Sequence, residues 1–229
     1  MSRLADCYRL LKRRLYVSGT TERAIIDDFH RLYHQVGRIE GSWGVTWRGR
    51  PVAQNPMDLM AIARIIQEQK KPPVLEIGTG TGGSALFYRD VEVPAVVTID
   101  LAPPRPFRYD GHIHYIQGDS TAISLRLVRD AFRQSIRSWR GRALVILDGD
   151  HHAQTVSREL QLYSSFVPIG GYLIVCDTHF NGHPIAPEFG PGPWEAVEDW
   201  LPRHPEFVRD RSVEQLLTFN PGGYLKRIK

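Results

Sequence analysis

The sequence has few cysteines and no long apolar run. Its 229 residues include only Cys7 and Cys176, which argues against a disulfide framework and favours a reducing compartment. No apolar run approaches the roughly 18–20 residues that span a bilayer. Residues 1–16 are basic and lack the apolar core of a signal peptide. We therefore expect a cytoplasmic protein with no membrane partner.

The net charge is small, +4, and its excess lies in the first fifty residues, which hold ten Lys or Arg and five Asp or Glu. No aromatic stacking pattern accompanies them, so we expect no nucleic-acid partner. Residues 3–17 and 21–36 show helical spacing. We interpret residues 1–50 as a helical appendage that acts as a lid or contacts a second subunit, and residues 51–229 as the main domain.

From residue 56 onwards, apolar strands alternate with helices. The pattern predicts strands at 73–77, 95–100, 112–117, 143–148 and 171–177, and helices at 58–69, 83–89, 121–139, 154–166 and 194–201. Continuous apolar strands of this kind indicate a parallel sheet covered on both faces. Near the end, residues 215–219 and 224–228 flank Asn220-Pro221-Gly222-Gly223, which predicts an antiparallel hairpin. The predicted fold class is α/β, mostly parallel, with a C-terminal hairpin.

A glycine-rich turn follows the first predicted strand. Glu76 precedes Gly78-Thr79-Gly80-Thr81-Gly82-Gly83, and glycines let a backbone approach a ligand closely. A carboxylate beside a pyrophosphate would be unfavourable, which argues against a dinucleotide such as NAD. The Glu76 carboxylate suits a ligand that carries an ammonium and a sulfonium group, as S-adenosylmethionine does.

The other strand ends supply further candidates, because ligands of open parallel sheets bind there. We expect Glu76 to pair with the donor's ammonium group, directly or through water, while Asp100 binds the ribose hydroxyls. Asp119 and Ser120 are placed to meet the adenine, and Gly118 just before them is a further donor-binding candidate. The alternative for Asp100, Asp119 and Ser120 is a role in capping or turns.

Asp148 and Asp177 end neighbouring strands, so a hard cation such as Mg²⁺ could bridge them. A hydroxyl on that ion would lose its proton more easily, and His151 is placed to accept it. The alternatives are that Asp148 and Asp150 cap the next helix and that His151 makes a structural hydrogen bond. A zinc site is a further alternative, formed by His152, His179 and His183 with Asp148 and Cys176. Cys176 could also serve as a nucleophile.

Several blocks together resemble the cephalosporin hydroxylase family. They are Trp47-Arg48-Gly49, Gln54-Asn55-Pro56 with Asp58, Glu76-Ile77-Gly78-Thr79-Gly80 with Gly82-Gly83-Ser84, Leu147-Asp148-Gly149-Asp150-His151-His152, Asp177-Thr178, Gly190-Pro191-Gly192-Pro193 with Ala196-Val197, and Pro221-Gly222-Gly223-Tyr224-Leu225-Lys226-Arg227. The resemblance implies a class I methyltransferase fold, Rossmann-like, with an S-adenosylmethionine site and a nearby Mg²⁺. By this match the donor-binding residues also include Gly78, Thr79, Gly80, Gly82 and Ser84.

The sequence is also similar to metal-dependent sugar O-methyltransferases of macrolide biosynthesis. Their Asp-x-x-His motif, which carries a metal ligand and a general base, matches Asp148 and His151, and their second metal-binding strand end matches Cys176-Asp177. The cephalosporin hydroxylase family usually has an acidic residue at the position of Cys176, so the hard-metal site would be weaker here.

We therefore expect an S-adenosylmethionine-dependent O-methyltransferase that acts, with Mg²⁺, on a hydroxyl of a small molecule, either a secondary metabolite or a sugar. The long segment 178–193 and the N-terminal helices are candidates for a lid. Two other functions stay open: a hydroxylase component of the cephalosporin hydroxylase type, and a binding module without catalytic activity.

Overall fold

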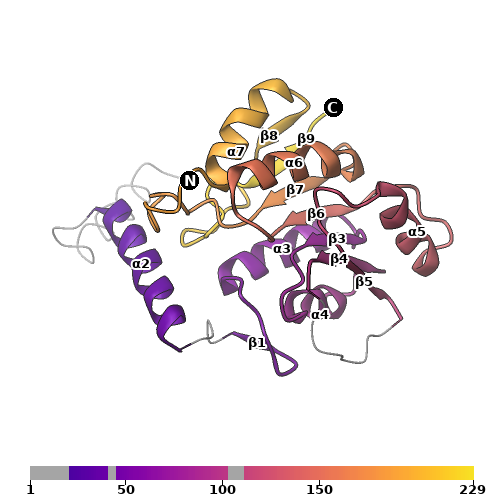
Figure 1. The fold of residues 1–229 in the computed structure, drawn as a ribbon, viewed down its shortest axis with the longest axis horizontal. Helices are drawn as coiled ribbons and strands as arrows, with labels where there is room; N and C mark the ends of the chain where they lie inside the picture. Colours follow the sequence, from indigo (N-terminus) through magenta and orange to yellow (C-terminus); the bar gives the residue numbers. More distant parts are fainter. Residues whose placement is uncertain (1–20, 41–44, 103–110) are drawn as a thin grey trace, which may run out of the picture.

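A seven-stranded sheet forms the centre of the computed structural model, which describes residues 21–40, 45–102 and 111–229 (Figure 1). Its strand order is β5-β4-β3-β6-β7-β9-β8. The strands are β3 (Val74–Ile77), β4 (Val96–Asp100), β5 (Ile113–Gln117), β6 (Leu144–Leu147), β7 (Tyr172–Val175), β8 (Phe207–Arg209) and β9 (Tyr224–Arg227). Strands β3 to β7 pair in parallel, and β9 is antiparallel to both β7 and β8. The predicted α/β class is confirmed.

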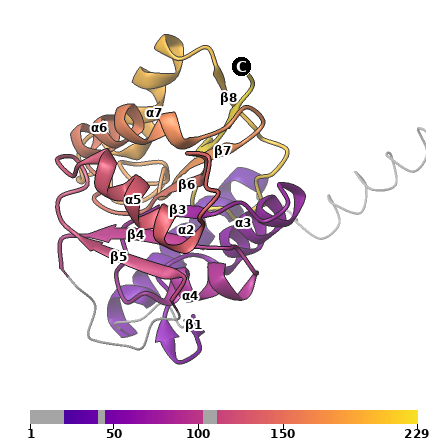
Figure 2. The ribbon, with the colours of Figure 1, turned by 90° about the vertical axis from the view of Figure 1, so that its right-hand side faces the viewer.

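Helices cover both faces of this sheet (Figure 2). One face carries α3 (Pro56–Glu68) and α4 (Gly83–Asp90); the other carries α5 (Leu125–Ser135), α6 (Ala153–Tyr163) and α7 (Pro193–Trp200), with short 3-10 turns at Ser164–Phe166 and Leu201–Arg203. Strand side chains alternate between the two layers: Leu75 joins the cluster under α5, α6 and α7, and Val74 the cluster under α3 and α4. The fully apolar strands are therefore buried on both sides.

Two N-terminal elements lie beside the sheet. Helix α2 (Glu22–Glu40) stands to one side of it (Figure 1), where Tyr33 packs against Phe219 with ring centroids 5.1 Å apart. Strands β1 (Thr46–Trp47) and β2 (Arg50–Pro51) form a short hairpin next to α4. The helix predicted at residues 3–17 falls outside the described residues. No helix in the described ranges is both long and apolar enough to cross a membrane.

One predicted helix is present but shorter than expected, and one predicted strand was wrong. The helix expected at 121–139 is α5, which starts only after Ser124; this side chain caps it by accepting from Arg126 N. The strand expected at 215–219 is absent from the described structure, and β9 pairs with β8 instead. The reason is a competing set of hydrogen bonds, because Thr218 and Phe219 donate to the buried Asp58 carboxylate of α3.

The strand order changes direction between β3 and β6: β4 and β5 follow on one side of β3, and β6 and β7 on the other. These two strands are neighbours, although β4 and β5 lie between them in the sequence. Gly78 after β3 and Asp148 after β6 approach so closely that a Cβ on Gly78, whose φ is +93°, would lie 1.9 Å from the Asp148 carbonyl oxygen. Such a reversal point is where open α/β sheets bind ligands.

Candidate active site

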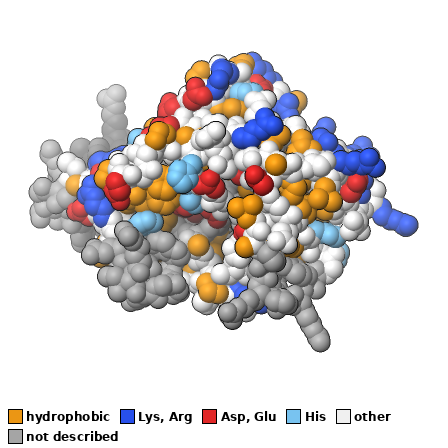
Figure 3. Space-filling model, in the orientation of Figure 1, with side chains coloured by type: hydrophobic (Ala, Val, Ile, Leu, Met, Phe, Trp, Pro, Cys, Tyr) orange, Lys and Arg blue, Asp and Glu red, His pale blue; other side chains and the backbone are white. Residues whose placement is uncertain are grey.

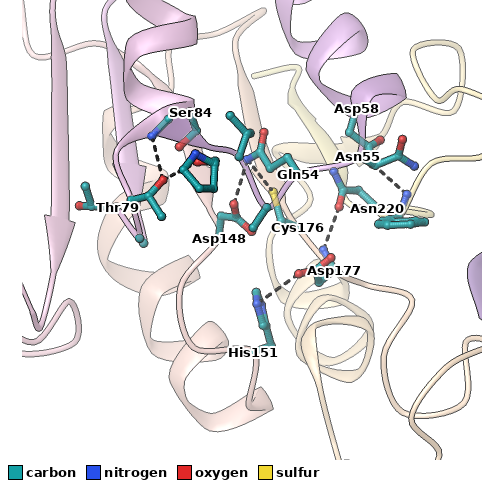
Figure 4. A pocket seen from close by; sticks show the side chains of 18 residues that line it. Gln54, Asn55, Asp58, Thr79, Ser84, Asp148, His151, Cys176, Asp177 and Asn220 are labelled. Atoms are coloured by element: carbon teal, nitrogen blue, oxygen red, sulfur yellow. Dashed lines mark hydrogen bonds and ion pairs between the residues drawn. The ribbon is translucent and has the colours of Figure 1, made fainter. Parts of the chain in front are cut away.

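Two cavities open at the carboxyl ends of the parallel strands, and they share Gly78, Gly80 and Asp148. The first, of about 300 Å³, is shown in Figure 4; its wall includes Gln54, Ser84, His151, Cys176, Asp177 and Asn220. The second, of about 540 Å³, extends over β4 and β5 and is lined by Asp100, Gly118, Asp119, Ser120 and Asp150, among others. An elongated ligand can therefore lie across the glycine turn with one end in each cavity.

The glycine turn is held in place by Asp100. The backbone N–H groups of Thr79 and Gly80 both donate to Asp100 Oδ2, at 2.9 Å each. Gly82, at φ +80°, precedes the first turn of α4, and its N–H donates to the Thr79 carbonyl at 2.8 Å. Asp100 thus has the turn-supporting role given as the alternative, and its carboxylate also lines the second cavity.

Glu76 lies beneath the first cavity, fully buried. Ser84 Oγ donates to its Oε1 at 2.5 Å, and Thr98 Oγ1 donates to its Oε2 at 2.6 Å. Burial raises the pKa of Glu76 to about 8. Ser84 lines the cavity in front of this carboxyl group, so the influence of Glu76 on a ligand there passes through Ser84.

Asp119 and Ser120, which were expected to meet the adenine, line the second cavity together with Gly118. Asp119 accepts from Thr121 N at 2.8 Å and from Thr121 Oγ1 at 2.7 Å, and these bonds lower the pKa of its carboxyl group. Ser120 Oγ donates to Glu159 Oε1 at 2.5 Å. The Asp119 and Ser120 side chains therefore shape the loop after β5, in addition to facing the cavity.

Asp148, His151 and Asp177 meet in the first cavity, each offering a ligand atom within 4.8 Å of the others. Figure 4 shows Asp148 and Asp177 on neighbouring loops with His151 below them. The His151 Nε2 atom lies 3.2 Å from Asp177 Oδ2. Asp177 has φ +54°, a left-handed conformation, and its N–H donates to Asn220 Oδ1 at 2.8 Å. Backbone strain of this kind is frequent at functional sites.

The charges of this cluster are poorly balanced by the protein itself. Burial, together with the neighbouring Asp177, raises the pKa of Asp148 to about 7, and burial likewise raises the pKa of Asp177 to about 7. Burial lowers the pKa of His151. Two carboxylates and one imidazole form a donor set that suits a divalent cation, and a cation there would favour the charged carboxylates.

Cys176 lies outside this ligand group. Its side chain is buried at the end of β7, 4.0 Å from Gln54 Nε2, and burial raises the pKa of its thiol well above the ordinary value. A thiol that stays protonated is a poor ligand and a poor nucleophile. The third potential ligand beside Asp148 and Asp177 is His151 instead of Cys176.

The residues of the alternative zinc site lie apart. His152 Nδ1 is 2.6 Å from Asp150 Oδ1, and His183 Nε2 is 2.9 Å from Glu195 Oε1. Asp150 also accepts from Thr155 Oγ1 at 2.6 Å, so it organises the first turn of α6 as its alternative predicted.

Sequence reasoning assigned no role to the residues of α3 and its N-terminus that complete the first cavity. Gln54 Nε2 donates to Asp148 Oδ2 at 2.9 Å. Asn55 caps α3 by accepting from Met57 N and donates Nδ2 to the Leu217 carbonyl at 2.7 Å. Asp58 accepts from Phe219 N at 2.9 Å and from Tyr224 OH at 2.8 Å. In the sequence, Gln54-Asn55-Pro56 and Asp58 could be noticed only as one block of the family resemblance, which gave these residues no individual role.

Residues 41–228 match the family model described as rhamnosyl O-methyltransferase/CmcI. The chain belongs to the rhamnosyl O-methyltransferase/CmcI family. A rhamnosyl O-methyltransferase of Mycobacterium leprae is 30% identical over 225 residues, which cover 92% of this chain and 95% of the relative. The rhamnosyl O-methyltransferase of Mycobacterium tuberculosis is 29% identical over 216 residues, 89% of this chain and 85% of the relative.

Solved structures share the fold of this family member. A structure of CmcI with Mg and SAM superposes with a TM-score of 0.57 at 19% identity, over 81% of this chain and 77% of CmcI. At that identity the likeness concerns the fold. Together with the mycobacterial relatives, family membership makes this chain an S-adenosylmethionine-dependent O-methyltransferase.

Proposed function

We propose that this family member transfers the methyl group of S-adenosylmethionine to a hydroxyl of a small, sugar-bearing acceptor, with Mg²⁺ at Asp148 and Asp177. The observation that carries the proposal is the meeting of Asp148, His151 and Asp177 in a cavity that opens directly beside the glycine turn. A methyl donor on the turn and an acceptor at the acidic cluster would then be neighbours.

The donor would lie along the glycine turn. Its adenosine part fits the second cavity, where Asp100, Gly118, Asp119 and Ser120 offer polar groups, and its methionine part fits the first. Ser84, supported by Glu76, faces the ammonium end. Acidic groups around both cavities suit a ligand that carries a positive sulfonium.

The acidic cluster would hold the acceptor and remove its proton. Asp148 and Asp177 would bind Mg²⁺ through oxygen, and the bound ion would lower the pKa of an acceptor hydroxyl. His151 is neutral near pH 7, because burial lowers its pKa. Its ring can donate from Nε2 to Asp177, which leaves the other nitrogen free to accept a proton.

Aromatic rings pack next to His151, which lines the first cavity. Phe180 packs near His151 with ring centroids 5.3 Å apart and stacks on Phe189 at 5.0 Å, and Phe189 stacks on His152 at 4.7 Å. These rings belong to the segment 178–193 and to the loop after β6, and they could receive the apolar face of a sugar ring. We propose that residues 1–50 are an appendage to a methyltransferase domain formed by residues 51–229. This appendage and the segment 178–193 would together close over the acceptor.

A product analysis tests the proposal. The purified chain is incubated with S-adenosylmethionine, Mg²⁺ and a panel of rhamnosides, and the products are weighed by mass spectrometry. Methylation adds one CH₂ group, whereas the alternative hydroxylase activity would add one oxygen atom. Donor binding without any turnover across the panel would support the non-catalytic alternative instead. Loss of methylation on addition of a chelator would support the role of the ion.

A further inference from the structure

Three histidines from distant parts of the chain meet next to the acidic cluster. His30 and His34 lie four residues apart on α2, and therefore on one face of the helix. His179 follows Asp177 by two residues. The ring centroid of His179 lies 5.2 Å from that of His30 and 5.9 Å from that of His34. Figure 3 shows other histidine side chains next to acidic ones on the surface of one face, whereas His30 and His179 lie below the surface.

Two of these rings are buried without hydrogen bonds. His30 is 2% exposed and His179 is 1% exposed, and neither nitrogen of either ring has a hydrogen-bond partner among the described residues. Phe219 packs against both rings, at centroid distances of 4.9 and 4.4 Å. Buried polar atoms are nearly always paired in folded proteins. Both His30 nitrogens and His179 Nδ1 have no hydrogen bond, and His179 Nε2 has only the Asp177 carboxylate 3.6 Å away, so the cluster points to a missing ligand.

We propose that His30, His34 and His179 bind a transition-metal dication of the Zn²⁺ type, at a site separate from the Mg²⁺ site. Imidazole suits Zn²⁺, whereas carboxylates suit Mg²⁺, so the two neighbouring sites would select different ions. Two histidines four residues apart on a helix are a frequent zinc-binding pair. This inference stands on the histidine geometry and does not depend on methyl transfer.

The ring separations suit a shared ion. With a Zn–N distance of about 2.0–2.1 Å and tetrahedral angles, the centroids of two bound imidazoles lie about 5 Å apart. The observed 5.2 and 5.9 Å are close to this value. Within the described ranges, only Asp148, His151 and Asp177 already have ligand atoms within 4.8 Å of one another. The histidine rings would therefore have to turn to bring their nitrogens together on an ion.

Asp177 would join the two sites. The His179 Nε2 atom lies 3.6 Å from Asp177 Oδ1. Zinc-bound histidines commonly present their second N–H to a carboxylate, which fixes the ring and its tautomer. His179 would then bind the ion through Nδ1 and steady Asp177 through Nε2. An ion held by α2 and His179 would fasten the N-terminal helix to the rim of the active site.

The test uses Co²⁺ as a spectroscopic probe and Zn²⁺ as its competitor. The full chain is stripped with a chelator, supplied with excess Mg²⁺ and titrated with Co²⁺. We expect one Co²⁺ per chain with the intense visible absorption of tetrahedral coordination, and its displacement by Zn²⁺. Weak absorption typical of octahedral coordination, or no saturable binding, would overturn the proposal.

Variants locate the ion. His34→Gln, which changes a half-buried ring, and His179→Gln should each weaken Co²⁺ binding at least about tenfold, while the exposed His112→Gln should leave it unchanged. Asp148→Asn should keep the tetrahedral signal. The proposal is wrong if His34→Gln and His179→Gln bind Co²⁺ as the parent chain does, or if Asp148→Asn abolishes the signal. Melting curves of each variant verify folding.

Discussion

At the scale of single residues, Asp148 connects the two cavities with the acidic cluster. It accepts from Gln54, lines both cavities and belongs to the ligand group with His151 and Asp177. We expect Asp148→Asn to lower methyl transfer by at least about 10- to 100-fold, since loss of a metal contact has effects of this size. Steady-state kinetics across a range of Mg²⁺ concentrations measure it. Asp130→Asn, on the exposed surface of α5, is the control; equal rates in both variants would remove the ion from the mechanism.

We expect His151 to accept the proton of the acceptor hydroxyl and to play no part in binding the methyl donor. His151→Gln should lower kcat about 10²- to 10⁴-fold, the usual contribution of a general base, and leave the affinity for S-adenosylhomocysteine nearly unchanged by calorimetry. Because burial lowers the pKa of His151, the wild-type rate should rise with pH through a midpoint below the ordinary histidine value of about 6.5. If the variant lost Mg²⁺ affinity as well as rate, His151 would be a ligand of the ion.

At the scale of elements, the N-terminus of α3 connects stability with the site. Asn55 caps this helix and also holds the Leu217 carbonyl of the C-terminal loop. Asn55→Ala should lower the free energy of unfolding by about 1–2 kcal/mol and reduce activity, because Asn220 of the same loop accepts from Asp177 N–H.

The matched control is the cap of α5. Ser124→Ala removes a bond to Arg126 N at a helix far along the sheet, and should lower stability by about 1 kcal/mol. Its rate at a temperature well below melting should equal that of the parent chain. If both variants lose the same fraction of activity, the Asn55 contact has no special role in the site.

The strands and the glycine turn were predictable from local sequence, because apolar runs such as 143–148 have few alternatives to a buried strand. The pairing of β9 was not, since it depends on where Thr218 and Phe219 find hydrogen bonds, and that partner, Asp58, lies 160 residues away. The meeting of Asp148 with Asp177 followed from the topology of parallel strands. The contact of His179 with α2 is tertiary, and no local pattern indicates it.

At the scale of the whole molecule, buried acids make stability depend on pH. The pKa values are raised by burial to about 8 for Glu76, about 7 for Asp148 and Asp177, and about 6 for Asp58. The folded state therefore keeps protons that the unfolded chain has released above about pH 4–4.5. By linkage, these acids make the free energy of unfolding fall as pH rises. Buried histidines with lowered pKa values, such as His30 and His151, oppose that effect below about pH 6.5, so the net fall is expected between about pH 6.5 and 8.

Melting curves in chelator across this range should show that fall. Addition of Mg²⁺ should lessen it, because the ion favours the charged forms of Asp148 and Asp177. Glu76→Gln should flatten its upper part, since a neutral amide has no proton to release. A melting temperature that rose steadily between pH 5 and 8 would contradict these assignments.

The contact between Gly78 and the Asp148 carbonyl has a mechanical consequence. Even one added methyl group at position 78 would force β3 and β6 apart at their tips. The glycine turn, proposed to bind the donor, and the loop after β6, proposed to hold the ion, therefore cannot move independently of each other. The segments that would contact the acceptor can therefore change, and acceptor preference with them, whereas position 78 must remain glycine.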